Sequence, residues 1–301
     1  MVRNAILRRV TMRLLAYELF TIQRSIMYNK VYVEITNICN KNCSFCHGHH
    51  RPPRRMSREE FSLILDRLTG VTQYVYYHLM GEPLTHPLLP EFVRMAGERG
   101  YKSIITTNGT LLHRCGDALL RAGVHKVNLS LHSFEDASDE EHARYLSELA
   151  AFAKSAAEVG TIVVFRLWNK GVDGGKNATA LQLLQEHLPG TWAENRRGVR
   201  VRDNVYLEWG ERFAWPDIEA PVQGTRFFCY GLKDQFGILC DGTVVPCCLD
   251  SEGCIALGNV FEEDLHTILR SERALAMVQG FGRGEASEEL CRRCGYAQRF
   301  V

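Results

Sequence analysis

The residues in this chain that are best suited to chemistry are its cysteines, most of which fall into two groups. The sequence has 301 residues and 11 cysteines. The first group, with the spacing C-x3-C-x2-C, consists of Cys39, Cys43 and Cys46. The second group lies in the last third of the chain, and its candidate ligands are Cys229, Cys247, Cys291 and Cys294. Because soft thiolates favour zinc or iron–sulfur clusters, both groups are candidate metal sites.

The spacing of the first group is compatible with two kinds of metal centre. A structural zinc site needs a fourth ligand, which His47, His49 or His50 could supply. A 4Fe–4S cluster normally takes four cysteines, so three would leave one iron open for a substrate or a cofactor. The spacing alone does not decide between zinc and a cluster.

The composition of the chain indicates the class of protein in which these thiols occur. The chain is 46% hydrophobic and has a net charge of +1, so it can bury a real core, and nucleic-acid binding is not indicated. The sequence shows no secretory signal, and no stretch reaches the roughly 20 apolar residues of a membrane span. An odd number of closely spaced cysteines is typical of metal ligands rather than disulfides. We therefore expect a cytoplasmic protein with no membrane span.

The elements that must position the cysteines alternate between strand and helix. Residue alternation predicts strands at 31–38, 74–79, 102–108, 126–132, 161–168 and 205–209. Periodicity and capping signals predict helices near 57–70, 88–99, 111–122, 139–159 and 177–187, the last followed by a polar loop. This alternation is typical of a parallel α/β fold with right-handed crossovers, although it does not distinguish an open sheet from a barrel.

The pattern changes after residues 215–216, and this change divides the chain into parts. We expect a basic, amphipathic N-terminal extension at 1–30, an α/β domain at 31–217 and a small cysteine-rich domain at 222–301. The small domain contains a predicted hairpin, 238–245, around the turn dipeptide Asp241-Gly242.

Four short motifs follow the first four predicted strands. The cysteine loop has Phe45 before its last cysteine, and MGEP (80–83), TTNG (106–109) and LSLHS (129–133) end the next three strands. Active sites of parallel α/β folds lie at the carboxyl ends of their strands. In this order and at these places the motifs resemble those of the radical S-adenosylmethionine (SAM) superfamily, with Met80 where glycine is usual.

The resemblance implies a partial (β/α)6 barrel that holds a 4Fe–4S cluster on the first three cysteines and SAM on the open iron. One electron would cleave SAM to a 5′-deoxyadenosyl radical, which abstracts a hydrogen atom from a substrate. By the same resemblance, Gly81 and Glu82 lie near the methionine part of SAM, Phe45 near the adenine, Ser130 and His132 near the ribose, and Pro83 and Asn108 elsewhere around the cofactor. The methionine carboxylate needs a cation, and the candidates are Arg144 and Arg166, of which Arg166 suits a carboxylate clamp on a strand better.

The second cysteine group resembles a SPASM or twitch domain. Cys229, the segment DGTVVPC (241–247), LGN (257–259) and a terminal C-x2-C carry this resemblance. It implies one auxiliary 4Fe–4S cluster, closed by Cys229, Cys247, Cys291 and Cys294. Two clusters with a non-cysteine ligand, or Cys248 in place of Cys247, remain alternatives, whereas a zinc ribbon lacks its second short cysteine pair.

Several residues outside these motifs have open roles. Glu208 lies at the end of the sixth predicted strand and could contact substrate or act as an acid or base. Structural roles are expected for His78 and His86, and the arginines of the run 51–58 are expected to be solvated.

The sequence therefore predicts a radical SAM enzyme that takes its electron from a flavodoxin- or ferredoxin-type reductant. Its substrate, whether a peptide, a small molecule or a nucleoside, is open. The alternative is a non-enzymatic interaction protein that binds zinc or a cluster.

Overall fold

The fold is built on one mixed β-sheet that runs through most of the molecule. The computed structural model describes residues 27–134 and 137–300, so residues 1–26 of the predicted amphipathic extension lie outside the described residues. Within these ranges the sheet has 11 strands in the order β11-β10-β9-β1-β2-β3-β4-β5-β8-β7-β6. The strands are β1 (Lys30–Val33), β2 (Tyr74–Tyr76), β3 (Lys102–Thr107), β4 (Lys126–Ser130), β5 (Ile162–Leu167), β6 (Ala193–Asn195), β7 (Gly198–Arg202), β8 (Val205–Trp209), β9 (Gln235–Ile238), β10 (Thr243–Val245) and β11 (Gly258–Asn259).

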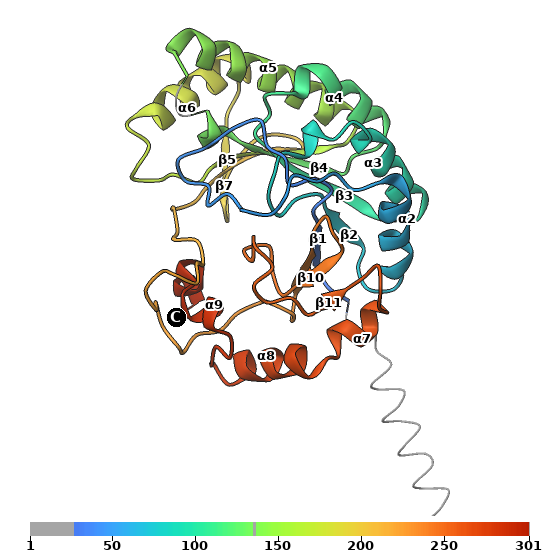
Figure 1. The fold of residues 1–301 in the computed structure, drawn as a ribbon. Coiled ribbons are helices and arrows are strands. Elements are labelled where there is room, and N and C mark those ends of the chain that lie inside the picture. Colours follow the sequence, from blue (N-terminus) through green and yellow to red (C-terminus); the bar gives the residue numbers. More distant parts are fainter. Residues whose placement is uncertain (1–26, 135–136, 301) are drawn as a thin grey trace, which may run out of the picture.

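Helices cover the outer face of the curved sheet (Figure 1). In the first part of the chain they are α2 (Arg58–Arg67), α3 (Leu89–Glu98), α4 (Leu112–Arg121), α5 (Asp139–Glu158) and α6 (Lys176–His187), and in the last part α7 (Leu265–Leu269), α8 (Glu272–Gly282) and α9 (Glu289–Arg292). Capping boxes start two of them, since Ser57 pairs with Glu60 at α2 and Ser138 with Glu141 at α5.

The predicted strand–helix alternation is confirmed. β1, β2, β3, β4, β5 and β8 pair in parallel and in sequence order, which gives the six-stranded partial barrel. Along each strand the side chains alternate between the two faces. On β5, for example, Val163, Phe165 and Leu167 are buried in the core, whereas Arg166 lies on the opposite, concave face that we call the lumen.

Two local predictions were wrong. The first strand was expected to reach residue 38 but ends at Val33, because the chain then turns to pair with the segment after the cysteine loop, where Met56 N–H donates to Ile35 O over 2.8 Å. The polar loop expected after residue 187 contains the antiparallel strands β6 and β7, which pair with each other and extend the sheet beyond β8.

The C-terminal part of the chain is joined to the barrel by the sheet itself. The predicted hairpin is present as β9 and β10, and β9 also pairs in parallel with β1, where Val31 lies opposite Phe236. In Figure 1 the C-terminal helices α7, α8 and α9 lie on the side of the molecule opposite α3 to α6. The cysteine-rich segment therefore closes the side of the barrel that the six parallel strands leave open.

No helix within the described residues has the length and the apolar run that crossing a bilayer requires.

Candidate functional site

The loop that carries the first three cysteines follows β1 at the carboxyl edge of the sheet. Cys39 and Cys46 are exposed and Cys43 is half-buried, with its Sγ 3.7 Å from the carbonyl oxygen of Ser133. Burial of its sulfur, with smaller contributions from Glu82 and Cys46 nearby, raises the pKa of Cys39. The three thiols therefore share one edge of the sheet with the LSLHS and GEP motifs.

The GEP motif is tied to the start of the cysteine loop by its backbone. Gly81 has φ +74°, and a Cβ at this position would lie 2.5 Å from the carbonyl oxygen of Thr36. The next residue, Glu82, donates its backbone N–H to the carbonyl oxygen of Ile38 over 2.9 Å. Gly81 is thus required by close packing against the chain that leads into the cysteines.

The carboxylate of Glu82 holds two motifs together. It accepts hydrogen bonds from the backbone N–H of Leu84 at 2.9 Å, the hydroxyl of Thr107 at 2.6 Å and the backbone N–H of Asn108 at 2.7 Å. Burial raises the pKa of Glu82 to about 7, against the lowering effect of these donors. Pro83 is buried and begins the 3₁₀ turn that Glu82 caps.

Asn108 connects the third motif to the cysteine loop. Its amide nitrogen donates to the side-chain oxygen of Asn40 at 2.9 Å, and its own oxygen accepts from the backbone N–H and the hydroxyl of Thr110 at 3.0 and 2.7 Å. Asn40 in turn donates to the Thr110 hydroxyl at 2.9 Å. This network fixes the residue next to Cys39 relative to β3.

Aromatic rings gather on the other side of the cysteine loop. The rings of Phe45 and His132 lie 4.5 Å apart, and the guanidinium of Arg212 lies 5.5 Å from the Phe45 ring. The indole N–H of Trp215 donates to the carbonyl oxygen of Phe45 at 3.0 Å. Ser130 ends β4 and caps the 3₁₀ turn that contains His132. The predicted adenine and ribose contacts are therefore neighbours at this edge.

The two candidate arginines lie in different environments. Arg166 lies on the lumen face of β5, with its guanidinium 5.1 Å from the ring of Trp168. Arg144 is exposed on α5, close to Glu141. Glu208, on β8, is the register neighbour of Arg166, but no ion pair within 4.0 Å joins these two side chains.

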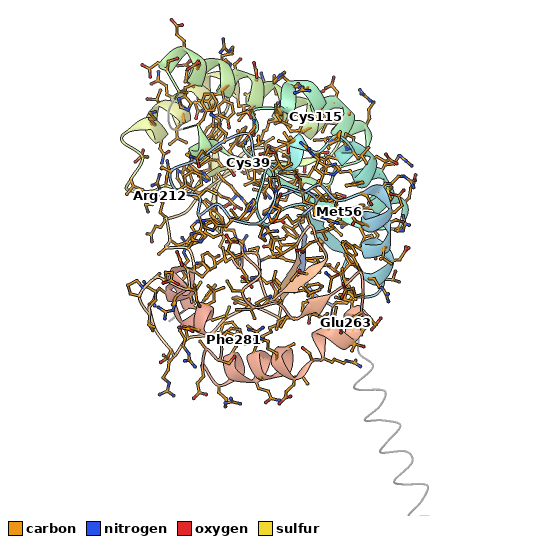
Figure 2. All side chains as sticks on the ribbon, in the orientation of Figure 1. Cys39, Met56, Cys115, Arg212, Glu263 and Phe281 are labelled. Atoms are coloured by element: carbon orange, nitrogen blue, oxygen red, sulfur yellow. The ribbon has the colours of Figure 1, made fainter. Side chains whose placement is uncertain are left out.

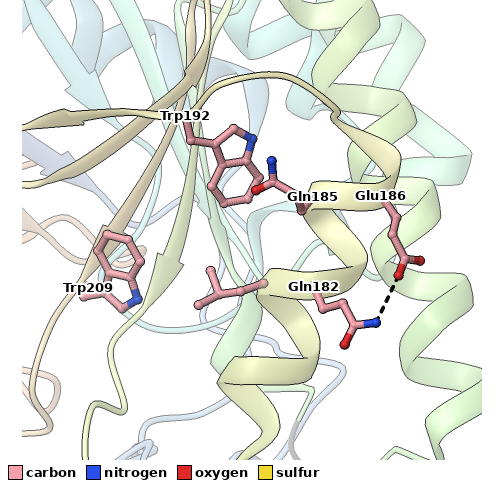
Figure 3. Close-up of a pocket in the computed structure, with 6 residues that line it drawn as sticks. Gln182, Gln185, Glu186, Trp192 and Trp209 are labelled. Carbon is pink, nitrogen blue, oxygen red and sulfur yellow. Dashed lines mark hydrogen bonds between the residues drawn. The ribbon is translucent and has the colours of Figure 1, made fainter.

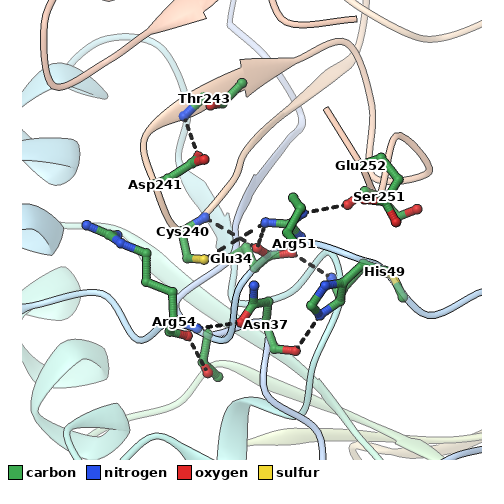
Figure 4. A network of polar contacts seen from close by, with 12 residues as sticks. Glu34, Asn37, His49, Arg51, Arg54, Cys240, Asp241, Thr243, Ser251 and Glu252 are labelled. Atoms are coloured by element: carbon green, nitrogen blue, oxygen red, sulfur yellow. Dashed lines mark hydrogen bonds and ion pairs between the residues drawn. The ribbon is translucent and has the colours of Figure 1, made fainter. Parts of the chain in front are cut away.

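A buried ion pair links the cysteine loop to the C-terminal segment (Figure 4). Arg51 donates from both terminal nitrogens to the carboxylate of Glu34 at 2.8 Å and from Nε to the carbonyl oxygen of Ser251 at 2.7 Å. Glu34 also accepts from the backbone N–H groups of Met80 and Cys240. The side chain of Glu34 is 0% exposed and that of Arg51 12%, so the expectation that Arg51 is solvated was wrong.

The histidines that could have completed a zinc site have other partners. Nε2 of His49 lies 2.8 Å from the carbonyl oxygen of Asn37, and Nδ1 of His50 lies 3.2 Å from the carboxylate of Glu252. His47 stacks on the ring of Trp215. Within residues 27–134 and 137–300, no three His, Cys, Asp or Glu side chains are arranged to hold a single metal ion.

The second cysteine group surrounds a cavity of about 380 Å³. Its lining includes four cysteines from three separate segments, namely Cys229, Cys247, Cys291 and Cys294. Burial raises the pKa of Cys294 to about 11, and those of Cys247 and Cys291 are also raised well above the ordinary thiol value by burial and by the other cysteines. The donor set and the space fit a cluster held by four thiolates, whose binding would release the thiol protons.

The remaining cysteines lie outside this cavity. Cys248 makes a hydrogen bond with the hydroxyl of Tyr32 and packs against the lumen residues. Cys240 is buried beside Arg51, and Cys254 is exposed. Cys115 lies on α4 in the helical outer layer, apart from Cys39 (Figure 2). Adjacent residues of an extended chain face opposite sides, which explains why Cys247 and Cys248 diverge.

The structure also has a larger hollow of about 520 Å³ on its outside. Leu181, Gln182, Gln185 and Glu186 of α6 form one wall, and Trp192 and Trp209 the other (Figure 3). None of the predicted ligands or cofactor contacts lines this hollow, so we do not assign it to the active site.

Sequence reasoning missed a set of polar side chains in the lumen. They are Tyr32 on β1, Tyr76 and His78 on and after β2, and Asn128 on β4. Their signal was the period of two along each strand, because polar residues alternate here with apolar ones that face the helices. This alternation could have shown that the concave face is a polar, buried surface.

Comparison with known proteins agrees with both halves of the site. The model of the radical SAM superfamily matches residues 33–168, and that of SPASM, an iron–sulfur cluster-binding domain, matches residues 229–295. A probable GTP 3′,8-cyclase from Methanothermobacter thermautotrophicus is 33% identical, with 77% of this chain and 88% of that protein covered. The GTP 3′,8-cyclase from Chlorobaculum tepidum is 29% identical over 52% of this chain and 50% of that protein. The chain spans about half the length of the first curated relatives that it matches.

A solved structure shares the fold at lower identity. BtrN, in complex with AdoMet and 2-DOIA, aligns with a TM-score of 0.58 and 17% identity, covering 89% of this chain and 93% of that one. The chain therefore belongs to the radical SAM superfamily and carries a SPASM domain. Members of this superfamily are enzymes that use a 4Fe–4S cluster and SAM, and the SPASM domain adds auxiliary iron–sulfur centres, as the sequence motifs predicted.

Proposed function

We propose that this enzyme cleaves SAM reductively and abstracts a hydrogen atom from a substrate in the barrel. The observation that carries this proposal is the convergence of three thiols with the GEP, TTNG and LSLHS segments at one edge of the sheet. When bound to Cys39, Cys43 and Cys46, a reduced 4Fe–4S cluster with one open iron supplies the electron that splits SAM into methionine and a 5′-deoxyadenosyl radical.

In this proposal the residues of the chain orient SAM. The GEP segment, with Gly81, Glu82 and Pro83, presents its backbone beside the cysteine loop, and Glu82 keeps that segment fixed to Asn108. Phe45 and His132 offer an aromatic surface for the adenosine, next to Ser130. Of the two candidate cations for the methionine carboxylate, Arg144 and Arg166, we propose Arg144, because Arg166 lies on the lumen face of β5. Glu208 is a proposed acid or base at the end of β8.

We propose one auxiliary 4Fe–4S cluster on Cys229, Cys247, Cys291 and Cys294. The four side chains line one cavity, whereas Cys240, Cys248 and Cys254 have different surroundings, which supports a single auxiliary cluster. Because four thiolates leave no iron open, this cluster would transfer electrons or stabilise the fold rather than bind SAM. The proposed division is a barrel at 31–217 and a cluster domain at 222–301.

The reaction needs an external electron, which we propose comes from a flavodoxin or ferredoxin. All 11 cysteines are free thiols, which suits the reducing cytoplasm. The relatives named GTP 3′,8-cyclase make a nucleotide one candidate substrate, beside a peptide or another small molecule.

Anaerobic purification followed by a SAM cleavage assay tests this function. We expect about eight iron and eight sulfide per chain, from two 4Fe–4S clusters, and 5′-deoxyadenosine after addition of SAM and dithionite. The Arg121→Met variant, altered on the surface of α4, is the matched control and should give the same yield. Zinc without iron, or no 5′-deoxyadenosine with any reductant, would contradict the proposed function.

A further inference from the structure

Arg166 is a largely buried cation with no anion within 4.0 Å among the described residues. Its Nε is fully shielded from solvent and has no hydrogen-bond partner among the described residues. None of the ion pairs found in that part of the chain includes it, and Glu208, the nearest carboxylate on the neighbouring strand, lies beyond 4.0 Å. A buried charge without a partner costs several kcal/mol, so it is retained only where something compensates it.

Two further polar atoms in the same lumen lack partners. Nδ1 of His78 and Oδ1 of Asn128 are buried and make no hydrogen bond to any described residue. The amide nitrogen of Asn128 is held by Thr106 at 3.1 Å, so the orientation of its unpaired oxygen is fixed. Because most buried polar groups in folded proteins are paired, three orphans on one concave surface indicate a missing ligand.

The charges around Arg166 specify the sign of that ligand. The positive charge of Arg197 acts on both Lys126 and Arg166, that of Arg166 acts on Lys126, and Glu208 is the carboxylate that acts on both Lys126 and Arg166. Glu34, directly after β1, is already neutralised by Arg51. The lumen therefore carries an excess of positive charge, which an anionic group would offset.

We propose that Arg166 binds an anionic oxygen group, a carboxylate or a phosphate, of the substrate that enters the lumen. This inference rests on the proposed function and specifies the substrate of that same site. A guanidinium suits either group, because its parallel N–H donors match two oxygens. His78 and Asn128 would hydrogen-bond to the substrate beside its anionic group. The unpaired atom of Asn128 is an oxygen, so the substrate group that meets it must be a hydrogen-bond donor.

The position of the guanidinium favours the substrate over the SAM carboxylate as the partner of Arg166. Its charge acts on the hydroxyls of Tyr32 and Tyr76, which lie within the paired part of β1 and β2. The cysteines and the GEP motif come after those strands have ended. Although the backbone of Arg166 lies opposite Ser130, its guanidinium acts on side chains of β1 and β2 inside the lumen, where a substrate would meet the radical.

Calorimetric titration of the anaerobic, cluster-loaded enzyme tests this assignment. The probes are inorganic phosphate and acetate, with KCl at matched ionic strength as the blank and SAM in a separate titration. The variants are Arg166→Met, Arg166→Lys and the surface control Arg121→Met. We expect the wild type and Arg121→Met to bind one of the two anions, Arg166→Lys to bind it more weakly, and Arg166→Met to lose about thirtyfold or more in affinity, as for a broken buried charge pair.

The same variants provide a readout that does not depend on finding the right anion. Arg166→Met removes an unpaired buried charge, so its urea midpoint without anion should equal or exceed that of the wild type, and added anion should no longer raise it. Preference for phosphate or for acetate identifies the class of group.

Three results would overturn the proposal. The wild type could bind neither anion beyond the KCl blank, or Arg166→Met could bind as well as Arg121→Met. In the third case, SAM affinity falls with Arg166→Met and SAM displaces the anion, which would assign Arg166 to SAM. A chain that binds anions through Arg166 but forms no 5′-deoxyadenosine would contradict the proposed function and leave the anion site standing.

Discussion

The two cysteine groups use the same ligand chemistry in opposite surroundings. The loop of Cys39, Cys43 and Cys46 lies at the edge of the sheet with two of its three cysteines exposed, next to polar segments that hydrogen-bond to one another. The second group is drawn from three chain segments around an internal cavity, and burial holds its thiols protonated when no metal is bound. In our proposal, openness rather than ligand type separates the SAM-binding centre from the auxiliary one.

The largest effect should follow from removing a thiol of the open group. We expect Cys43→Ala to abolish 5′-deoxyadenosine formation while the auxiliary cluster stays, so that about four iron per chain remain. Chromatographic quantification of 5′-deoxyadenosine, with iron analysis of the same sample, measures both quantities. Cys115→Ala, on α4, is the matched control and should keep both. SAM cleavage by Cys43→Ala would show that the loop has been assigned wrongly.

A thiol of the closed group should affect iron content before it affects SAM cleavage. Cys294→Ala should lose the auxiliary cluster, because the remaining three ligands no longer close the cavity, yet still form 5′-deoxyadenosine. Iron and sulfide analysis, with electron paramagnetic resonance of the reduced sample, reports the loss. The exposed Cys254→Ala is the control. An unchanged iron content in Cys294→Ala would remove this residue from the proposed ligand set.

The ion pair between the two halves should affect stability. Arg51→Met leaves the carboxylate of Glu34 buried without its cation, which costs about 3–5 kcal/mol. Urea unfolding of the apo chain measures this change. Arg58→Met, which breaks the exposed pair with Glu91, should change the unfolding free energy far less, because water screens that pair. Equal effects of the two substitutions would mean that the Arg51–Glu34 pair does not stabilise the junction.

The smallest predicted effect is a change in pH dependence. Burial, with Arg166 nearby, lowers the pKa of His78 to about 3. Between pH 6.5 and that value the unfolded chain binds a proton at His78 and the folded chain does not, so this residue lowers the unfolding free energy as pH falls, by at most about 1.4 kcal/mol per pH unit.

Replacement of His78 should remove its contribution to the pH dependence of the unfolding free energy. Urea midpoints of His78→Gln should fall less steeply below pH 6.5 than those of the wild type, whereas His113→Gln, exposed on α4, should follow the wild type. Parallel curves for His78→Gln and the wild type would place His78 in a solvated environment instead.

Much of the barrel could be predicted from sequence because its signals are local. Caps such as Ser57–Glu60 and the period of two in residues 161–168 each depend on neighbouring residues, and they gave helix and strand positions within a few residues. The motif order also identified the family, which the matching models confirm.

The features that could not be predicted from the sequence depend on contacts between distant segments. The pairing of β9 with β1 joins residues about 200 apart, and no local pattern specifies it. In the sequence Arg51 is an arginine beside a Pro-Pro turn, and only the fold places Glu34 and Ser251 within hydrogen-bond distance of it. The polar lumen appears in the sequence only as polar residues that alternate with apolar ones along the strands. The sequence does not show which of the two faces becomes the concave, closed one.

The central claim, that one cysteine group is open to SAM and the other closed, can be tested by one spectroscopic comparison. Electron paramagnetic resonance spectra of reduced Cys294→Ala and Cys43→Ala would be recorded with and without SAM. Our account predicts that SAM changes the cluster signal of Cys294→Ala, in which the open cluster remains, and leaves that of Cys43→Ala unchanged. A SAM-dependent change in Cys43→Ala, with none in Cys294→Ala, would contradict it.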